Sequence, residues 1–183
     1  LINLSVRTFA GADADTLIVG FVGGGSGARS LLLRGVGPTL TNFGVTGVLA
    51  NPRMTAFAQS TVVATNDDWG AAANAGSIAS TAPAVGAFAL PNGSLDAALL
   101  NNFSAGGYTV QVVGAGGATG VALVEAYDAG GAATGRLINV SARSAVGTGS
   151  GILIAGFVVS ETTRAVLIRG IGPALSGFGV AGA

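Results

Sequence analysis

The sequence predicts an all-β protein: an antiparallel β-sandwich of the jelly-roll or immunoglobulin-like kind, followed by the first third of a second copy that supplies linking strands. Short apolar segments recur along the chain, with breaks rich in Gly, Asn, Asp or Pro between them, which is typical of sandwiches and barrels. No stretch keeps a capped helical period for more than two turns. The first 48 residues also recur near the end of the chain, as they do in tandem repeat proteins.

The repeat relates residues 1–48 to residues 137–183. With one gap in the turn from Gly23 to Ala28, 22 of 47 aligned positions are identical, and most of the others exchange one small or apolar residue for another. We therefore expect a complete sandwich over residues 1–136 and a partial second repeat over residues 137–183. The second copy has no counterpart of the residues that follow Val48 in the first.

The apolar segments give the expected strands in order. In the first repeat they are residues 2–7, 16–22, 29–36, 53–58, 61–65, 84–89, 107–113 and 120–127, and in the second they are 138–143, 151–159 and 165–171. The segment from Leu95 to Leu100 is assigned to a strand in preference to one or two turns of helix.

The breaks between these segments carry turn residues. Glycines from Gly23 to Gly27 and from Gly114 to Gly117 suit hairpin connections. Gly37-Pro38 and Gly172-Pro173 end their strands, because proline cannot donate to a β-ladder. Residues 66–81 form the longest polar segment and are expected to run over the surface.

The composition excludes several classes of function. Half of the residues are hydrophobic, 9% are charged, and the net charge is zero, so the chain lacks the basic surplus that nucleic-acid binding needs. It contains no Cys, His or Lys, which removes the nucleophile systems and metal sites that depend on those residues. We expect no enzymatic activity. No apolar run reaches the length of a membrane span.

The second copy is expected to be an interface. If five of its large apolar side chains stayed in water, the forgone burial would be on the order of 10 kcal/mol, comparable to the stability of a whole domain. We therefore expect this segment to pack on another copy of the chain or on a neighbouring repeat. The residues assigned to the interface are Ile152, Leu153, Ile154, Phe157, Val158, Val166, Leu167, Ile168 and Arg169.

Residues 51–128 resemble a known family. Asn51-Pro52, Asn66-Asp67-Asp68, Gly107-Tyr108-Thr109-Val110 and Gly120-Val121 follow the order of motifs in the bacterial pre-peptidase C-terminal domain and its relatives, which are small secreted β-sandwiches. Together with the repeated segment, this region also resembles a long tandem repeat of large exported bacterial surface proteins. The resemblance implies a non-catalytic module at an extracellular or cell-surface location.

Asn66, Asp67 and Asp68 place three oxygen-bearing side chains together on a loop, which suits Ca²⁺. The resemblance implies the same, since related sandwiches bind calcium through acidic loops. The alternative is an Asx turn, whose side chains bond nearby backbone amides; a calcium site would need further oxygens, from Asp96 or from the Asp13 and Asp15 pair. Trp69, which follows this turn, is expected to cap the end of the core.

Arg34 and Arg169 occupy the same position in the two copies, each inside an apolar strand. One interpretation pairs them with a carboxylate across a subunit boundary, Glu125 or Asp128. The other places each arginine at the solvent end of its strand, and this second interpretation is the one the sequence favours.

The leading hypothesis is a structural subunit of an extracellular filament or stalk, a homopolymer or repeat array. In it the second copy either adds strands to a neighbour's sheet or, by strand exchange, occupies the place of the neighbour's own first third. We expect that contact to be heterologous, so that it propagates. The alternatives are a ligand-binding repeat of a giant surface adhesin, with recognition in the loop at residues 66–81, and an accessory domain of a secreted hydrolase. Because the sequence begins at Leu1 without a leader, it is expected to be a piece of a larger product.

Overall fold

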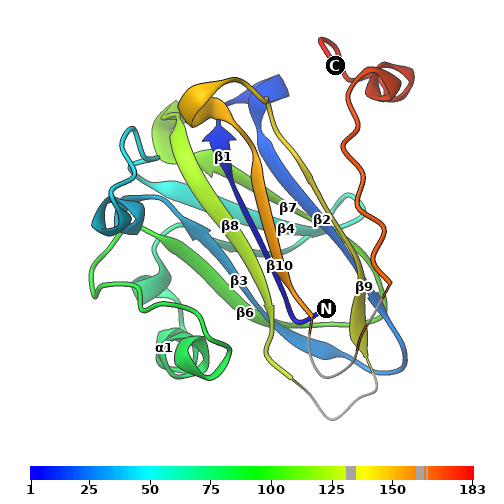
Figure 1. Cartoon of the computed structure of the whole chain (residues 1–183). Coiled ribbons are helices and arrows are strands. Elements are labelled where there is room, and N and C mark those ends of the chain that lie inside the picture. Colours follow the sequence, from blue (N-terminus) through cyan, green and yellow to red (C-terminus); the bar gives the residue numbers. More distant parts are fainter. Residues whose placement is uncertain (131–134, 160–162, 164) are drawn as a thin grey trace.

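The computed structural model describes residues 1–130, 135–159, 163 and 165–183. Two five-stranded antiparallel sheets face each other (Figure 1), which confirms the predicted β-sandwich. The first sheet has the order β10 (Ile154–Val158), β1 (Asn3–Ala10), β8 (Gly120–Asp128), β3 (Arg29–Val36) and β6 (Ala97–Phe103). The second has the order β5 (Thr61–Asn66), β4 (Pro52–Ala58), β7 (Gly106–Gly114), β2 (Leu17–Gly24) and β9 (Arg136–Arg143).

The eight strands of the first repeat form a sandwich by themselves. Their orders, β1-β8-β3-β6 in one sheet and β5-β4-β7-β2 in the other, are those of a jelly roll. Strands β9 and β10, both from the second copy, add to the edges at β2 and β1. The chain is thus one complete jelly roll that is extended on one side by two strands of its own repeat.

The main core lies between the two sheets and follows the alternation of the strands. Leu31 and Leu33 of β3 point into it, together with Val124 and Ala126 of β8. On the other face of the first sheet, Leu32 packs in a second cluster with Trp69, Ile78 and Tyr127 among others. Both faces of β3 are therefore buried, which explains why its sequence is almost continuously apolar.

A helix that the sequence analysis missed covers the outer face of the first sheet. It is α1 (Ala75–Ala84), and the expected strand at residues 84–89 is wrong, because the structure has the end of this helix and a turn there. The helix buries only Ile78 and Ala82, four residues apart on one side. Its other residues are small, so it gives almost no apolar period by which a sequence reading would find it.

The other helical segments are single 3-10 turns or pairs of turns. They are η1 (Asp13–Asp15), η2 (Pro38–Phe43), η3 (Trp69–Ala71), η4 (Ala115–Gly117), η5 (Gly149–Gly151) and η6 (Pro173–Phe178). None of the helices in the described part of the chain has the length and apolarity to cross a bilayer. Trp69 lies in η3 and is buried in the second cluster, so the prediction that it caps the core is confirmed.

A buried ion pair holds β3 to β8. Arg34 is fully buried, and its Nε and Nη2 donate to Oε2 of Glu125 at 2.8 and 2.5 Å. Its Nη1 donates to the carbonyl oxygen of Phe88, and its guanidinium carbon lies 4.2 Å from the centre of the Phe88 ring. The favoured solvent-end position of Arg34 is therefore wrong. Glu125 is the expected carboxylate, but it belongs to the same sandwich.

A second buried carboxylate, which the sequence analysis did not assign to this role, holds the turn after β3. Asp96 is fully buried; its Oδ1 accepts the backbone amide of Gly37 at 2.8 Å and that of Thr39 at 3.4 Å. Its Oδ2 accepts the hydroxyl of Thr39 and, at 2.8 Å, that of Ser94. These bonds fix the start of η2 against the strand β6.

The buried pair predicts a stability difference between two matched variants. Glu125→Gln keeps the shape of the side chain but leaves Arg34 without a counter-charge, so we expect the free energy of unfolding to fall by about 3–5 kcal/mol. Asp128→Asn breaks the pair with Arg29, in which the closest atoms are 2.6 Å apart; the Asp128 side chain is buried, but the Arg29 side chain is 26% exposed and can be solvated, so the loss should be smaller, about 1–2 kcal/mol. Urea unfolding of both variants measures this; equal losses would contradict the assignment.

Tyr127 predicts a loss of stability in alkali. Burial raises its pKa, and the charge of Glu125 and the hydrogen bond to it raise the pKa further, although Arg34 and Ser5 act in the opposite direction. The folded state therefore favours the neutral phenol. Stability should be complete below about pH 10 and should fall above it as the unfolded chain ionises, by at most about 1.4 kcal/mol per pH unit for this proton. Unfolding curves of the Tyr127→Phe variant should decline less steeply over this pH range.

Candidate functional site

The candidate site is the contact between the two copies of the repeated segment, which we call the copy interface: β1 with β10, and β2 with β9. In the first repeat alone, β1 and β2 end their sheets. An edge strand presents unpaired backbone amides and carbonyls, which favour pairing with another strand. Both edges lie on the side of the sandwich where the second copy adds its strands (Figure 1).

The two additions use one register. In the first sheet, residues 3 to 7 of β1 pair in order with residues 158 to 154 of β10. In the second sheet, residues 18 to 22 of β2 pair in order with residues 143 to 139 of β9. Equivalent residues in the two copies of these strands are 136 positions apart in the sequence. The β2–β9 ladder has a register shift after Val22, beyond these five pairs.

When each residue is replaced by its equivalent in the other copy, the β1–β10 ladder becomes the β2–β9 ladder, so the two ladders are the same contact made twice. Leu4 pairs with Phe157, the equivalent of Phe21. Phe21 itself pairs with Val140, the equivalent of Leu4. All five pairs of each ladder are reciprocal in this way, which is the property of an isologous interface with two-fold symmetry.

A side-chain contact agrees with this symmetry. Thr8 and Ser144 occupy the same position in the two copies, and the hydroxyl of Thr8 donates to that of Ser144 at 3.3 Å. Ser144 in turn donates to the carbonyl oxygen of Phe9 at 2.7 Å. A residue that touches its own counterpart lies close to a two-fold axis. The copies are thus related by an approximate two-fold axis next to β1 and β9.

Apolar packing reinforces the ladders on the inner face of the sandwich. Leu137 of β9 is buried in the main core, and Val140, Ala142 and Leu153 pack against it while partly buried. On the opposite face of the β2–β9 ladder, Gly20 leaves room for Ser141, since a Cβ atom at Gly20 would lie 2.8 Å from the Ser141 hydroxyl oxygen. The second copy therefore contributes to the hydrophobic core as well as to the sheets.

The structure separates the interface residues predicted from the sequence into two groups. Ile154, Phe157 and Val158 lie in β10 and pair with β1, and Ile152 and Leu153 precede that strand. Val166, Leu167, Ile168 and Arg169 are exposed and lie in an irregular segment. The expected strand at residues 165–171 is therefore wrong, because none of the strands that the structure describes pairs with it.

The symmetry of the copy interface differs from the heterologous contact expected from the sequence. One signal in the sequence points to it. Residues 3–7 and 18–22 make the reciprocal pairs, and seven of these ten positions are identical in the two copies, compared with 22 of 47 over the whole alignment. In an isologous contact, a residue of one copy and its equivalent in the other copy make the same contact, so both positions are under the same structural constraint.

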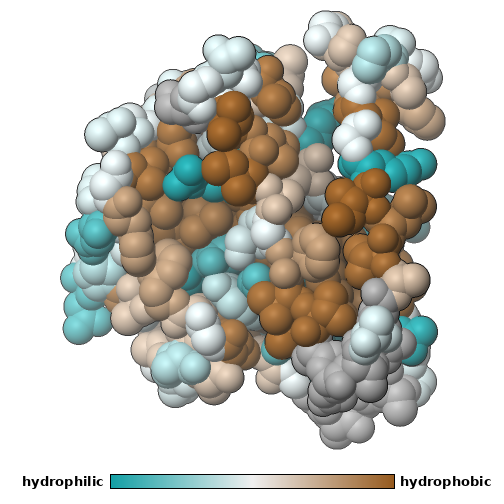
Figure 2. Space-filling view, in the orientation of Figure 1, coloured by the Kyte–Doolittle hydropathy of each residue, from teal (hydrophilic) through white to brown (hydrophobic). Residues whose placement is uncertain are grey.

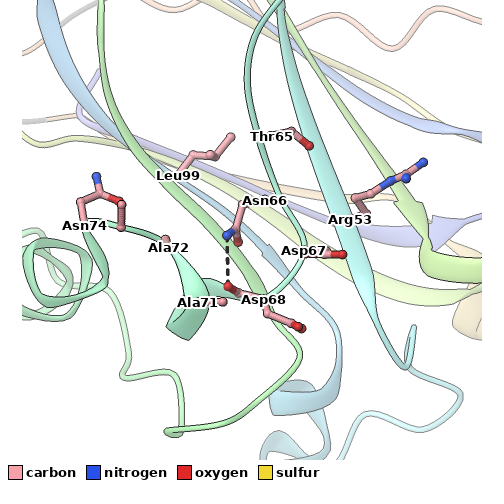
Figure 3. Close-up of a pocket in the computed structure, with 10 residues that line it drawn as sticks. Arg53, Thr65, Asn66, Asp67, Asp68, Ala71, Ala72, Asn74 and Leu99 are labelled. Carbon is pink, nitrogen blue, oxygen red and sulfur yellow. Dashed lines mark hydrogen bonds between the residues drawn. The ribbon is translucent and has the colours of Figure 1, made fainter.

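The second place considered for function is a hollow at the end of β5. It has a volume of about 530 Å³ and is lined by Arg53, Thr65, Asn66, Asp67, Asp68, Ala71, Ala72, Ala73, Asn74 and Leu99. Figure 3 shows the side chains of Asp67 and Asp68 pointing in different directions. The hollow is lined by both polar and apolar side chains, and it includes part of the segment at residues 66–81, to which the alternative adhesin hypothesis assigns ligand recognition.

The three predicted calcium ligands lie at this hollow, and one of them already has backbone partners. Asn66 accepts the backbone amide of Ala98 at 2.9 Å and donates to the carbonyl oxygen of Asp68 at 3.1 Å. It therefore joins the loop to β6, which differs from the Asx turn considered as the alternative, because its side-chain oxygen accepts a distant backbone amide instead of a nearby one. The other acidic residues considered do not join it in a cluster of three or more His, Cys, Asp or Glu within the described residues. Calcium binding stays a prediction.

Comparison with family models, curated proteins and solved structures gives no match for this chain.

The copy interface predicts opposite outcomes for two equivalent glycines. Gly20→Ala should weaken the β2–β9 ladder because of the collision with Ser141, whereas Gly156→Ala meets no atom within 4 Å and should leave the β1–β10 ladder intact. Amide hydrogen exchange measures both, with faster exchange in β9 expected for the first variant alone. Adding Ser141→Ala to Gly20→Ala should restore the slower exchange, and failure of this rescue would contradict the packing argument.

Proposed function

We propose that this chain is a structural subunit of an extracellular filament or stalk in which neighbouring repeats are joined by β-strand addition. The observation that carries the proposal is the reciprocal pairing of β1 with β10 and of β2 with β9. It covers both open edges on one side of the jelly roll with strands from the next repeat. Strand addition of this kind supplies main-chain hydrogen bonds for affinity and side-chain alternation for register.

Two further features support an assembly role. The net charge is zero and only 9% of the residues are charged, so electrostatic repulsion between copies is small. The second copy also exposes large apolar side chains, which Figure 2 shows gathered along the C-terminal segment at the right of the view. Contiguous apolar surface of this kind marks an interaction site.

The symmetry limits how such an assembly grows. An isologous contact closes on itself, so the copy interface by itself joins repeats in pairs. Growth beyond a pair then requires a second link, because in this chain the connection from β8 to β9 joins the same two copies that the copy interface pairs. The extracellular location draws on the resemblance of the sequence to exported bacterial repeats.

A ligand-binding repeat of a surface adhesin is the second candidate function. The hollow lined by Arg53, Asp67 and Asp68 favours it, because charged side chains of both signs line one hollow beside a loop. In that case the copy interface would serve only to hold successive repeats in position, and recognition would take place at the end of β5.

Electron microscopy together with the intact mass of the dissolved subunit tests the assembly. Filaments that separate into chains of about 17.5 kDa would support non-covalent strand addition. Beaded threads of much larger mass would support a covalent array of paired repeats. Dispersed single particles at all concentrations would contradict a filament or stalk.

Two substitutions in β10 test the role of strand addition. Ile154→Asp with Phe157→Asp should leave the sandwich of residues 1–128 folded and abolish the association of β10 with β1, because Phe157→Asp places a charge opposite Leu4 on the inner face. Val62→Asp is the control, since Val62 is exposed on β5 at the opposite edge of the sandwich. Association that survives unchanged in the double variant would remove the linking role of β10.

A further inference from the structure

The segment from residue 165 to residue 183 is a copy of β3 and η2 that lacks their surroundings. Leu32 is 0% exposed in β3, whereas its equivalent Leu167 is 85% exposed. Leu33 and its equivalent Ile168 differ in the same way, at 1% and 72%. In Figure 1 this segment leaves the sandwich and ends in η6. Its sequence is therefore suited to a buried central strand, while its position in this chain exposes it.

The turn that follows this segment nevertheless has the conformation of its equivalent. η6 (Pro173–Phe178) and η2 (Pro38–Phe43) both begin after a glycine with similar dihedral angles and end at a left-handed glycine, with φ of 77° at Gly179 and 74° at Gly44. The backbone bonds also agree: Leu175 N donates to Gly172 O at 2.8 Å, and Leu40 N donates to Gly37 O at 3.0 Å. The turn is thus already formed without a partner.

The first copy shows what surrounds such a segment. β3 lies between β6 and β8 and pairs with both. Glu125 of β8 neutralises Arg34, and Asp96 accepts the amides at the start of η2. In the second copy, Arg169 and the amides of Gly172 and Ala174 stand at the same positions.

A second molecule of this chain cannot supply this surrounding without losing its own. Residues 1–183 contain two copies of the first third of the repeat and one copy of the part that follows it. In each molecule β6 and β8 are already paired with its own β3. If one molecule gave its β6 and β8 to the second copy of another molecule, its own β3 would lose them. An exchange between identical chains would therefore bury one copy of the first third of the repeat and expose another.

We propose that residues 165–183 form a docking segment for a polypeptide that carries the counterparts of β6 and β8. This partner presents a glutamate to Arg169 and an aspartate to the amides of Gly172 and Ala174. The inference depends on the proposed joining of repeats by strand addition, and it names what completes the second sandwich. With that partner in place, each sheet would combine four strands from each repeat around the two-fold axis.

An extended chain tests the proposal. A copy of residues 49–136 is added after Ala183, which aligns with Val48, so that the second repeat is complete. Amide exchange at residues 165–171 should be fast in the 183-residue chain and slower by about 100-fold or more in the extended chain, as for a strand in a folded core. A scrambled extension of the same composition is the control and should leave the exchange fast.

Substitutions identify the chemistry of the docking. In the extended chain, the added glutamate equivalent to Glu125 is changed to Gln, which should lower the free energy of unfolding because it leaves Arg169 buried without a counter-charge. Adding Arg169→Met should reverse much of this loss, because each partner alone leaves a buried group unsatisfied. Arg53→Met, at an exposed arginine on β4, should reverse none of it. If the effects of the Glu-to-Gln change and of Arg169→Met on the free energy of unfolding simply add, the assigned ion pair is wrong.

The two proposals fail in different ways. Fast exchange at residues 165–171 in the extended chain, with β9 and β10 still protected, would overturn the docking proposal alone. Fast exchange in β9 and β10 of the 183-residue chain would overturn strand addition itself. Slow exchange at residues 165–171 that appears in the 183-residue chain only at high concentration would identify a second copy as the occupant and overturn the partner proposed here.

Discussion

The rest of the structure depends on the pairing of the two open edge strands of the sandwich, β1 and β2. Each edge strand carries a row of backbone donors and acceptors beside an apolar inner face, so leaving it open favours association. β9 and β10 meet this need with strands of nearly the same sequence as the strands they join. Because both edges are covered by one copy in one register, the contact has an approximate two-fold axis, and the similarity of the two copies is what makes that symmetry possible.

The same similarity places conflicting demands on the second copy. Phe21 is 2% exposed in the complete sandwich, and its equivalent Phe157 is 42% exposed on β10. Arg34 is neutralised by Glu125 inside the first repeat, whereas Arg169 stands in solvent. A second complete sandwich would bury both Phe157 and Arg169, whereas the copy interface uses only Phe157, which pairs with Leu4 in the β1–β10 ladder. The copy interface and the docking segment are therefore separate properties of one repeated sequence.

Much of the fold could be predicted from the sequence, because strand signals and turn residues are local. The strand at residues 29–36 was predicted with the bounds that β3 has in the structure. Helix α1 was missed because its small residues carry almost no period. The partner of Arg34 was among the predicted carboxylates, but its burial was not foreseen, because that depends on Phe88 from a distant loop folding over it. The two-fold symmetry depends on strand register, which no single segment specifies.

The contrast between η6 and the segment before it explains why the second copy is half formed. The backbone bonds of η6 join residues three to five positions apart, from Gly172 to Val180, so the turn needs nothing beyond its own sequence. The strand that would precede it needs β6 and β8, whose first-repeat equivalents lie more than 60 residues further along the chain than β3. Local structure forms first and non-local pairing waits for its partner. A preformed turn beside an unpaired apolar strand therefore lowers the ordering cost of docking, since part of the conformational entropy is already lost.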